Sequence, residues 1–113
     1  MVHEMKLQPN PFEKIKSGNK TIEIRLNDEK RQLVKVGDEV VFSLMTNPAQ
    51  KIRTEVLELL PFSTFQELFA AFLPEQYGGT NKDEYASMYK YYSREEEEKY
   101  GVLGIKLGYL GDI

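Results

Sequence analysis

A short segment of alternating polar and apolar residues stands out in the first third of the chain. Apolar residues occupy every second position of residues 21–26, the period of two that is typical of a half-buried strand. Glu23 and Arg25 therefore share the face opposite the apolar one. A charged face of this kind is most often a solvated strand surface, so the pattern alone leaves its role open. Lys20 precedes the strand, and we expect the turn to redirect its side chain.

A helix end and a tight turn come directly before this strand. Residues 11–16 predict a short helix with proline near its first turn, where the missing N–H costs little. Gly18 follows, and it is expected to stop the helix in the left-handed conformation. The segment from Lys16 to Leu26 therefore combines a helix end, a turn and a strand, and we expect the rest of the chain to be its scaffold.

The remaining elements show either the strand period of two residues or the helical spacing of three and four residues. Apolar residues at spacings of three and four after Thr64 predict a helix that packs on the sheet, and Thr64 with Glu67 forms a capping-box pattern. The apolar side of residues 51–60 switches partway along, which predicts a bulge or bend. Further strands are predicted at residues 3–7, 40–45 and 101–109, a loop at 46–50, and helices at 83–92 and after Ser93.

Three other features lie outside this motif. Residues 77–81 contain two glycines and predict a flexible loop, the least ordered part of the chain. The acidic run at residues 95–98 is interpreted as a solvated helix face near the positive end of the helix dipole. His3 is the only histidine, and we expect it to face solvent. We predict no metal site, because zinc takes three or four ligands and the chain has no cysteine.

Length and composition limit the kind of protein. The chain has 113 residues, 41% of them apolar, which predicts one domain spanning residues 1–113. The absence of cysteine excludes disulfides and thiolate chemistry. No segment resembles a signal peptide or approaches the roughly 20 apolar residues of a membrane span. We therefore expect a cytoplasmic protein that does not enter a membrane.

The charge is unevenly distributed. A net charge of −3 argues against a protein that coats nucleic acid indiscriminately. Residues 1–60 carry ten Lys and Arg against nine Asp and Glu, whereas residues 61–113 carry five against nine. We therefore expect any anion-binding site to lie in the first half of the chain.

The pattern Gly18-x-Lys20-x-x-Glu23-x-Arg25 resembles the signature of the ASCH domain family, a branch of the PUA-like β-barrels. The resemblance includes residues 11–16 before the pattern and 37–42 after it, and it continues through residues 91–93 and 100–105. It implies an α+β fold, a small closed mixed β-barrel of about five to six strands with about two to four flanking helices.

The resemblance implies that this motif lines a cleft for RNA or for a modified nucleoside or nucleotide, with no cofactor. Arg25 offers a planar fork of donors and Lys20 a mobile charge, while Glu23 either orients Arg25 or accepts from the amine of a base. Arg31 would extend the cationic rim, and the ring of Tyr92 would stack on a base. The predicted ligand-binding residues are Lys16, Lys20, Glu23, Arg25, Arg31 and Tyr92. The sequence leaves the oligomeric state open.

The same family offers two enzymatic alternatives. Some small ASCH-like proteins are amidohydrolases that deacetylate acetylcytidine with a lysine and a threonine from this motif and a later acidic residue. Lys20 matches the lysine, Glu23 occupies the position of the threonine, and Glu75 is the nearest candidate for the acid. Under this alternative these three residues are catalytic, with Glu23 as a general base. A metal-independent ribonuclease using Lys20 and Glu23 is the third possibility.

Overall fold

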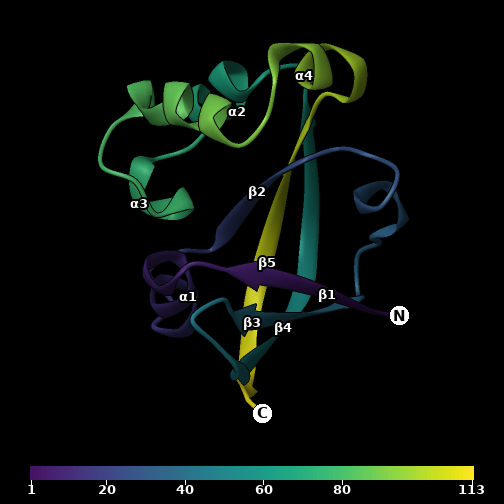
Figure 1. Ribbon diagram of the computed structural model, residues 1–113, viewed down its shortest axis with the longest axis vertical. Helices are drawn as coiled ribbons and strands as arrows, with labels where there is room; N and C mark the ends of the chain where they lie inside the picture. Colours follow the sequence, from purple (N-terminus) through teal and green to yellow (C-terminus); the bar gives the residue numbers. More distant parts are fainter.

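One mixed sheet of five strands runs through the molecule. The computed structural model describes residues 1–113, and its strands lie in the order β1-β3-β4-β5-β2 (Figure 1). β1 runs parallel to β3, and every other neighbouring pair is antiparallel. The strands are β1 (Val2–Leu7), β2 (Ile22–Leu26), β3 (Glu39–Leu44), β4 (Asn47–Phe62) and β5 (Val102–Asp112).

Helices cover two regions of this sheet. In Figure 1, α2, α3 and α4 gather at one end of the long strands β4 and β5, whereas α1 packs beside the other half. None of the helices has the length and apolar character needed to cross a bilayer. The bounds are α1 (Pro9–Lys16), η1 (Arg31–Leu33), α2 (Phe65–Ala71), α3 (Pro74–Tyr77), η2 (Lys82–Lys90) and α4 (Arg94–Tyr100), where η marks a 3-10 helix. The predicted mixed α+β fold is confirmed.

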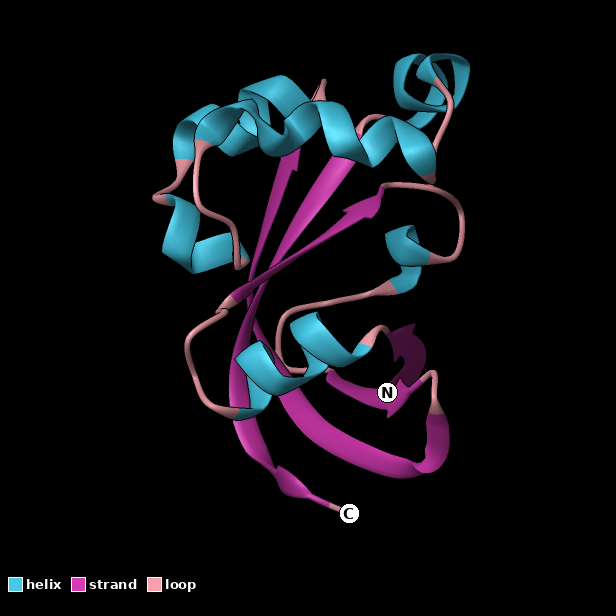
Figure 2. Ribbon diagram, turned by 60° about the vertical axis from the view of Figure 1, so that its left-hand side comes forward, coloured by secondary structure: helices cyan, strands magenta, loops and turns pink.

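The sheet forms a half-barrel. The pairing of β4 with β5 shifts register twice, between Arg53 and Thr54 and between Val56 and Glu58. The switch of the apolar side within residues 51–60 predicted such an irregularity. Figure 2 shows both long strands curving strongly. β1 and β2 are the two edges of the sheet and do not pair with each other. The barrel that we expected to be closed is therefore open in its backbone hydrogen bonding between β1 and β2.

Two apolar cores lie on opposite sides of β2. Phe12 and Ile15 of α1 belong to the larger core, which also includes residues of β1, β3, β4 and β5. Ile24 and Leu26 belong to a second core with Phe65 and other side chains of the helical end. Because the apolar face of β2 contacts the helices, its charged face is turned toward the larger core and the open gap.

The predicted loop at residues 46–50 and the predicted helix at residues 83–92 differ from the structure. Residues 46–50 are not a loop: Met45 and Thr46 form a tight turn, and β4 already begins at Asn47. The predicted α-helix at residues 83–92 is the 3-10 helix η2, Lys82–Lys90, which has three residues per turn. Tyr85, Met88, Tyr89 and Tyr92 nevertheless pack on the second core, as their spacing predicted.

The predicted flexible loop at residues 77–81 is held in place by side chains. Tyr77 ends α3 and is buried, and its hydroxyl donates to the carbonyl of Asn81 at 3.1 Å. The carbonyl of Gly78 accepts a hydrogen bond of 2.8 Å from Nζ of Lys14. The loop is therefore fixed against α1, which the glycine content did not indicate.

Two polar residues that we expected in solvent are largely buried. Glu97 of α4 accepts from the backbone N–H of Phe65 at 2.8 Å and from the hydroxyl of Tyr89. Nε2 of His3 lies 2.8 Å from Oδ2 of Asp38, and only 9% of the His3 side chain is exposed. Both predictions of a solvated side chain are wrong, because each group meets a polar partner distant in sequence.

Candidate functional site

A turn places Lys20 beside β2. α1 ends at Lys16, and Gly18 adopts a φ of +83°, a left-handed conformation that glycine takes without strain. The backbone N–H of Lys20 then donates to the carbonyl of Lys14 at 2.9 Å. The ammonium consequently reaches Glu23, with Nζ 3.0 Å from Oε1. The turn therefore redirects Lys20 as the sequence predicted.

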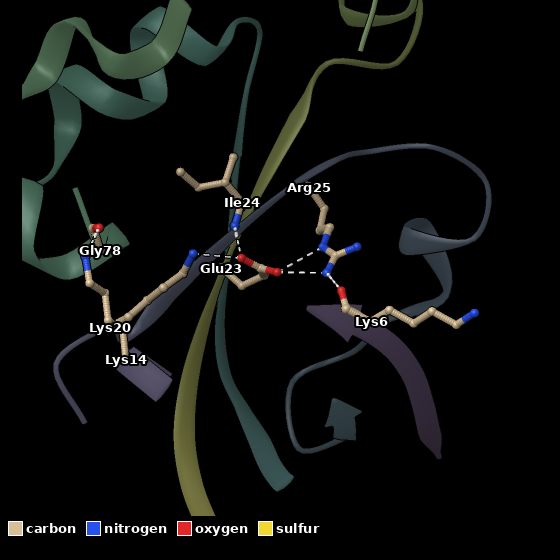
Figure 3. A network of polar contacts seen from close by, with 7 residues as sticks. All are labelled: Lys6, Lys14, Lys20, Glu23, Ile24, Arg25 and Gly78. Atoms are coloured by element: carbon tan, nitrogen blue, oxygen red, sulfur yellow. Dashed lines mark hydrogen bonds and ion pairs between the residues drawn. The ribbon is translucent and has the colours of Figure 1, made fainter. Parts of the chain in front are cut away.

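Glu23 is the centre of a network of polar contacts (Figure 3). Oε1 accepts from the backbone N–H of Ile24 at 3.1 Å and lies 3.0 Å from Nζ of Lys20. Oε2 accepts two hydrogen bonds from Arg25, of 3.0 Å from Nε and 2.9 Å from Nη2. Only 5% of the Glu23 side chain is exposed. The charged face of β2 is therefore not a solvated strand surface.

These contacts keep Glu23 ionised. Burial by itself would raise the pKa of Glu23, but the charges of Lys20 and Arg25 and their hydrogen bonds together hold that pKa below its usual value. A carboxylate has about four lone-pair positions, and four donors already point at this one. Glu23 is therefore suited to hold two cations in place rather than to accept from a ligand.

Arg25 also crosses the gap between the two edge strands. Its Nη2 donates to the carbonyl oxygen of Lys6 in β1 at 2.9 Å, in addition to its bonds with Glu23. Nη1 makes no hydrogen bond within the protein, and Figure 3 shows it pointing away from Glu23. The guanidinium plane is fixed on one side, and its remaining N–H groups are free to meet a ligand.

An open cavity of about 640 Å³ lies over this network. Small-molecule sites usually have about 300–1,000 Å³, so the cavity has the size of a ligand site. Four cations line it, Lys6, Lys14, Lys20 and Arg25, and Glu23 is its one carboxylate. A chain with a net charge of −3 therefore has a locally cationic cavity.

Aromatic side chains from the helical end form the opposite wall. Tyr91 and Tyr92 both line the cavity. The ring of Tyr92 stacks on Phe65, with centroids 5.6 Å apart and planes inclined by 23°, so one of its faces is already covered. Tyr91 is 71% exposed. Helical periodicity singled out Tyr92 and missed Tyr91, which has the freer ring.

Gly78 is a second residue that the sequence analysis missed. It lines the cavity with a φ of +83°, and its carbonyl accepts from Lys14. A Cβ at this position would lie 3.0 Å from Cδ of Lys20 and 3.5 Å from Cδ of Lys14. The absence of a side chain therefore lets both lysine stems pass close to the loop. The Gly-Gly pair at residues 78–79 was the available sequence signal.

Comparison with known proteins identifies the family of this chain. The model of the ASCH domain matches residues 5–110. The chain belongs to the ASCH domain family. The crystal structure of hypothetical protein PH0355 is 33% identical, with a TM-score of 0.86 over 97% of this chain and 100% of that chain. The solution structure of PF0455 from Pyrococcus furiosus is 34% identical, with a TM-score of 0.74 over 97% and 98%.

A more distant ASCH protein shares the fold alone. The crystal structure of a mutant of ZmASCH from Zymomonas mobilis is 14% identical, with a TM-score of 0.71 over 99% of this chain and 72% of that chain. No curated protein matches the chain significantly. The predicted family and PUA-like fold are confirmed. ASCH domains are generally RNA-binding or hydrolase-like.

Three predicted site residues of this ASCH domain lie outside the cavity. Lys16, in the last turn of α1, pairs with Asp112 near the end of β5 at 3.1 Å. Arg31 pairs with Asp28 at 3.1 Å and lines a neighbouring cavity. Glu75 lies exposed on α3. No group of three or more acidic or imidazole side chains gathers as a metal site would require.

Of the predicted site residues, the structure brings together Lys20, Glu23, Arg25 and Tyr92 around the cavity.

Proposed function

We propose that this ASCH domain binds RNA or a nucleotide and holds a nucleobase or phosphate in the cavity over Lys20, Glu23 and Arg25. One observation carries the proposal: a single buried carboxylate fixes an ammonium and a guanidinium at the floor of a ligand-sized cavity. Two cations held this way keep a fixed geometry, so that a ligand does not have to order them on binding.

Free donors on both cations suit an acceptor-rich ligand. An ammonium has three N–H groups, and the contact with Glu23 uses one of those on Lys20. Nη1 of Arg25 keeps both of its own. Phosphate oxygens and the carbonyl and ring-nitrogen edges of bases are the acceptors that such donors recognise.

The opposite wall suits a planar ring. Tyr91 is exposed beside the cavity, and stacking on an aromatic side chain contributes about 1–3 kcal/mol per base. The net charge of the chain is −3, which favours a short segment or a single nucleotide over a long duplex, because binding a long duplex needs a cationic surplus.

The geometry gives less support to the enzymatic alternatives. The lone pairs of Glu23 are all engaged and its pKa is lowered, so it is a weak general base for a water. No hydroxyl stands at position 23, and Glu75 is not among the residues that line the cavity. A ribonuclease that used Lys20 with Glu23 as its acid/base pair would first have to break their ion pair.

Titration of a short oligocytidylate tests the proposal. We expect Lys20→Gln to weaken binding about tenfold or more, because a charge-assisted hydrogen bond contributes about 1.5–3 kcal/mol. Lys106→Gln removes an exposed lysine of β5 as the matched control and should leave affinity unchanged. Equal affinities of all three proteins would contradict the proposal. Acetate released from acetylcytidine, or RNA cleaved, by the native protein but not by Lys20→Gln would favour an enzyme instead.

A further inference from the structure

A second cationic cavity, of about 440 Å³, adjoins the first. It is bounded by the loop at η1 and by β1, β3 and β4. Its charged lining residues are Lys6, Arg25, Lys30, Arg31, Lys51 and one carboxylate, Glu4. Five cations face one acid, so the cavity is more strongly cationic than the first.

Arg31 has a donor without an acceptor in this region. Its Nη1 pairs with Asp28 at 3.1 Å, but its Nε is buried and has no hydrogen-bond partner. Leaving a buried donor unpaired is unfavourable, and native structures contain few such groups. An oxyanion in the cavity that Arg31 lines would instead meet its Nη2, which makes no hydrogen bond within the protein and is not buried.

The two cavities share a wall. Lys6 and Arg25 line both of them. Figure 3 shows the carbonyl of Lys6 turned to Arg25, while its ammonium extends away from Glu23. Nη1 of Arg25 also points away from Glu23 and is free. Lys6 and Arg25 therefore present donors at the boundary between the two cavities.

We propose that the second cavity binds the phosphate of the ligand whose base lies in the first, so that the protein selects a phosphorylated nucleoside over a free one. This inference rests on the proposed function. Several cations around one small cavity suit a compact anion, and a guanidinium fork matches the oxygens of a phosphate. Lys30, Arg31 and Lys51 are then phosphate-binding residues, while Lys20 remains with the base or sugar.

Calorimetric titration tests this inference with cytidine, cytidine 3′- and 5′-monophosphate and the dinucleotide CpC as probes. We expect at least one phosphorylated probe to bind about tenfold more tightly than cytidine at low salt. Arg31→Gln and Lys51→Gln should each reduce that ratio and leave the affinity for cytidine unchanged. Lys106→Gln should change neither. Lys51 lies on β4, so Lys51→Gln still tests the inference if Arg31→Gln disturbs the loop at η1. Circular dichroism checks that each variant is folded.

The outcomes separate the two proposals. Binding of cytidine with no gain from phosphate, or a gain that survives both Arg31→Gln and Lys51→Gln, overturns this inference and leaves the proposed function standing. Absence of binding by every probe overturns both. Tightest binding of CpC identifies the phosphate as a diester within RNA, whereas tightest binding of a monophosphate identifies a terminal monoester. Either result supports the phosphate site, provided that the two variants reduce the gain.

Discussion

Nη2 of Arg25 lies 2.9 Å from the carbonyl oxygen of Lys6, and this hydrogen bond joins the two edge strands of the half-barrel. An unpaired sheet edge exposes backbone groups that need partners. Arg25 satisfies one of them while it holds Glu23, so it contributes to the fold as well as to the cavity. Lys20 has no such contact across the gap. Lys20 is therefore the better position for separating ligand binding from folding.

Loss of the Glu23 charge should destabilise the protein strongly. Glu23→Gln leaves two cations of the network without their counter-ion, and breaking a buried ion pair costs about 3–5 kcal/mol. The matched control is Glu39→Gln, because Glu39 pairs with Arg53 where both side chains are partly exposed, and such pairs contribute less than about 1 kcal/mol. Urea denaturation measures both variants. Equal losses in the two would show that the Glu23 network adds nothing beyond a surface pair.

A side chain at position 78 should impair the site specifically. Gly78→Ala strains a residue with a φ of +83° and brings its Cβ to 3.0 Å from Cδ of Lys20. Gly37→Ala imposes a similar strain at a φ of +92° with no atom within 4 Å of the added carbon. We expect comparable losses of stability, about 1 kcal/mol each, but weaker oligocytidylate binding only in Gly78→Ala. Equal binding by both variants would argue against a role for the lysine stems.

Substitution of the two neighbouring tyrosines should affect different properties, ligand affinity for Tyr91 and stability for Tyr92. Tyr91→Ala removes an exposed ring and should weaken oligonucleotide binding by about 1–3 kcal/mol with little change in melting temperature. Tyr92→Ala removes the ring that stacks on Phe65 and should lower the melting temperature. Calorimetric titration and thermal melting of both variants check the assignment. The assignment would be contradicted if Tyr92→Ala reduced only the affinity for the oligonucleotide and Tyr91→Ala reduced only the melting temperature.

Asp38 should make stability depend on pH in acid. The hydrogen bonds from His3 and from the backbone N–H of Lys35 lower the pKa of Asp38 to about 2. An unfolded aspartate titrates near about 3.9, so folding favours the ionised form. This stabilisation is complete above about pH 4 and is lost as the pH falls to about 2.

Asp38→Asn removes this titration and provides its test. The free energy of unfolding of the native protein should exceed that of the variant at about pH 5, and the difference should shrink toward about pH 2. Denaturant melts at several pH values measure it. A difference that stays constant over this range would mean that the contacts with His3 and Lys35 do not lower the pKa of Asp38.

Local periodicity accounts for what the sequence could predict. The strand at β2, the glycine stop at Gly18, the Thr64 cap and the bend in β4 each depend on residues a few positions apart. The grouping of Lys20, Glu23 and Arg25 followed from the same short range. These features need no knowledge of how distant segments pack.

The missing parts depend on contacts between distant segments. Glu23 is buried because α1 and the helical end enclose the cavity over an open edge of the sheet. The alternation of residues in β2 contains no information about these distant segments. Gly78 lies 64 residues from its partner Lys14. Tyr91 was missed because helical spacing selects the residues that pack on the core, whereas Tyr91 follows η2 with an exposed ring that meets the cavity only in the folded chain.

The most direct test of the account is a titration of the isotope-labelled protein with a short oligocytidylate, followed residue by residue by heteronuclear NMR. We expect the shifted backbone amides to cluster at residues that line the cavity, namely Gln8, Lys14, Lys20, Gly78 and Tyr91. The same titration of Lys20→Gln should lose most of these shifts at equal ligand concentration. Shifts that cluster elsewhere on the surface, or none at saturating oligonucleotide, would contradict the proposal that this cavity binds nucleotides.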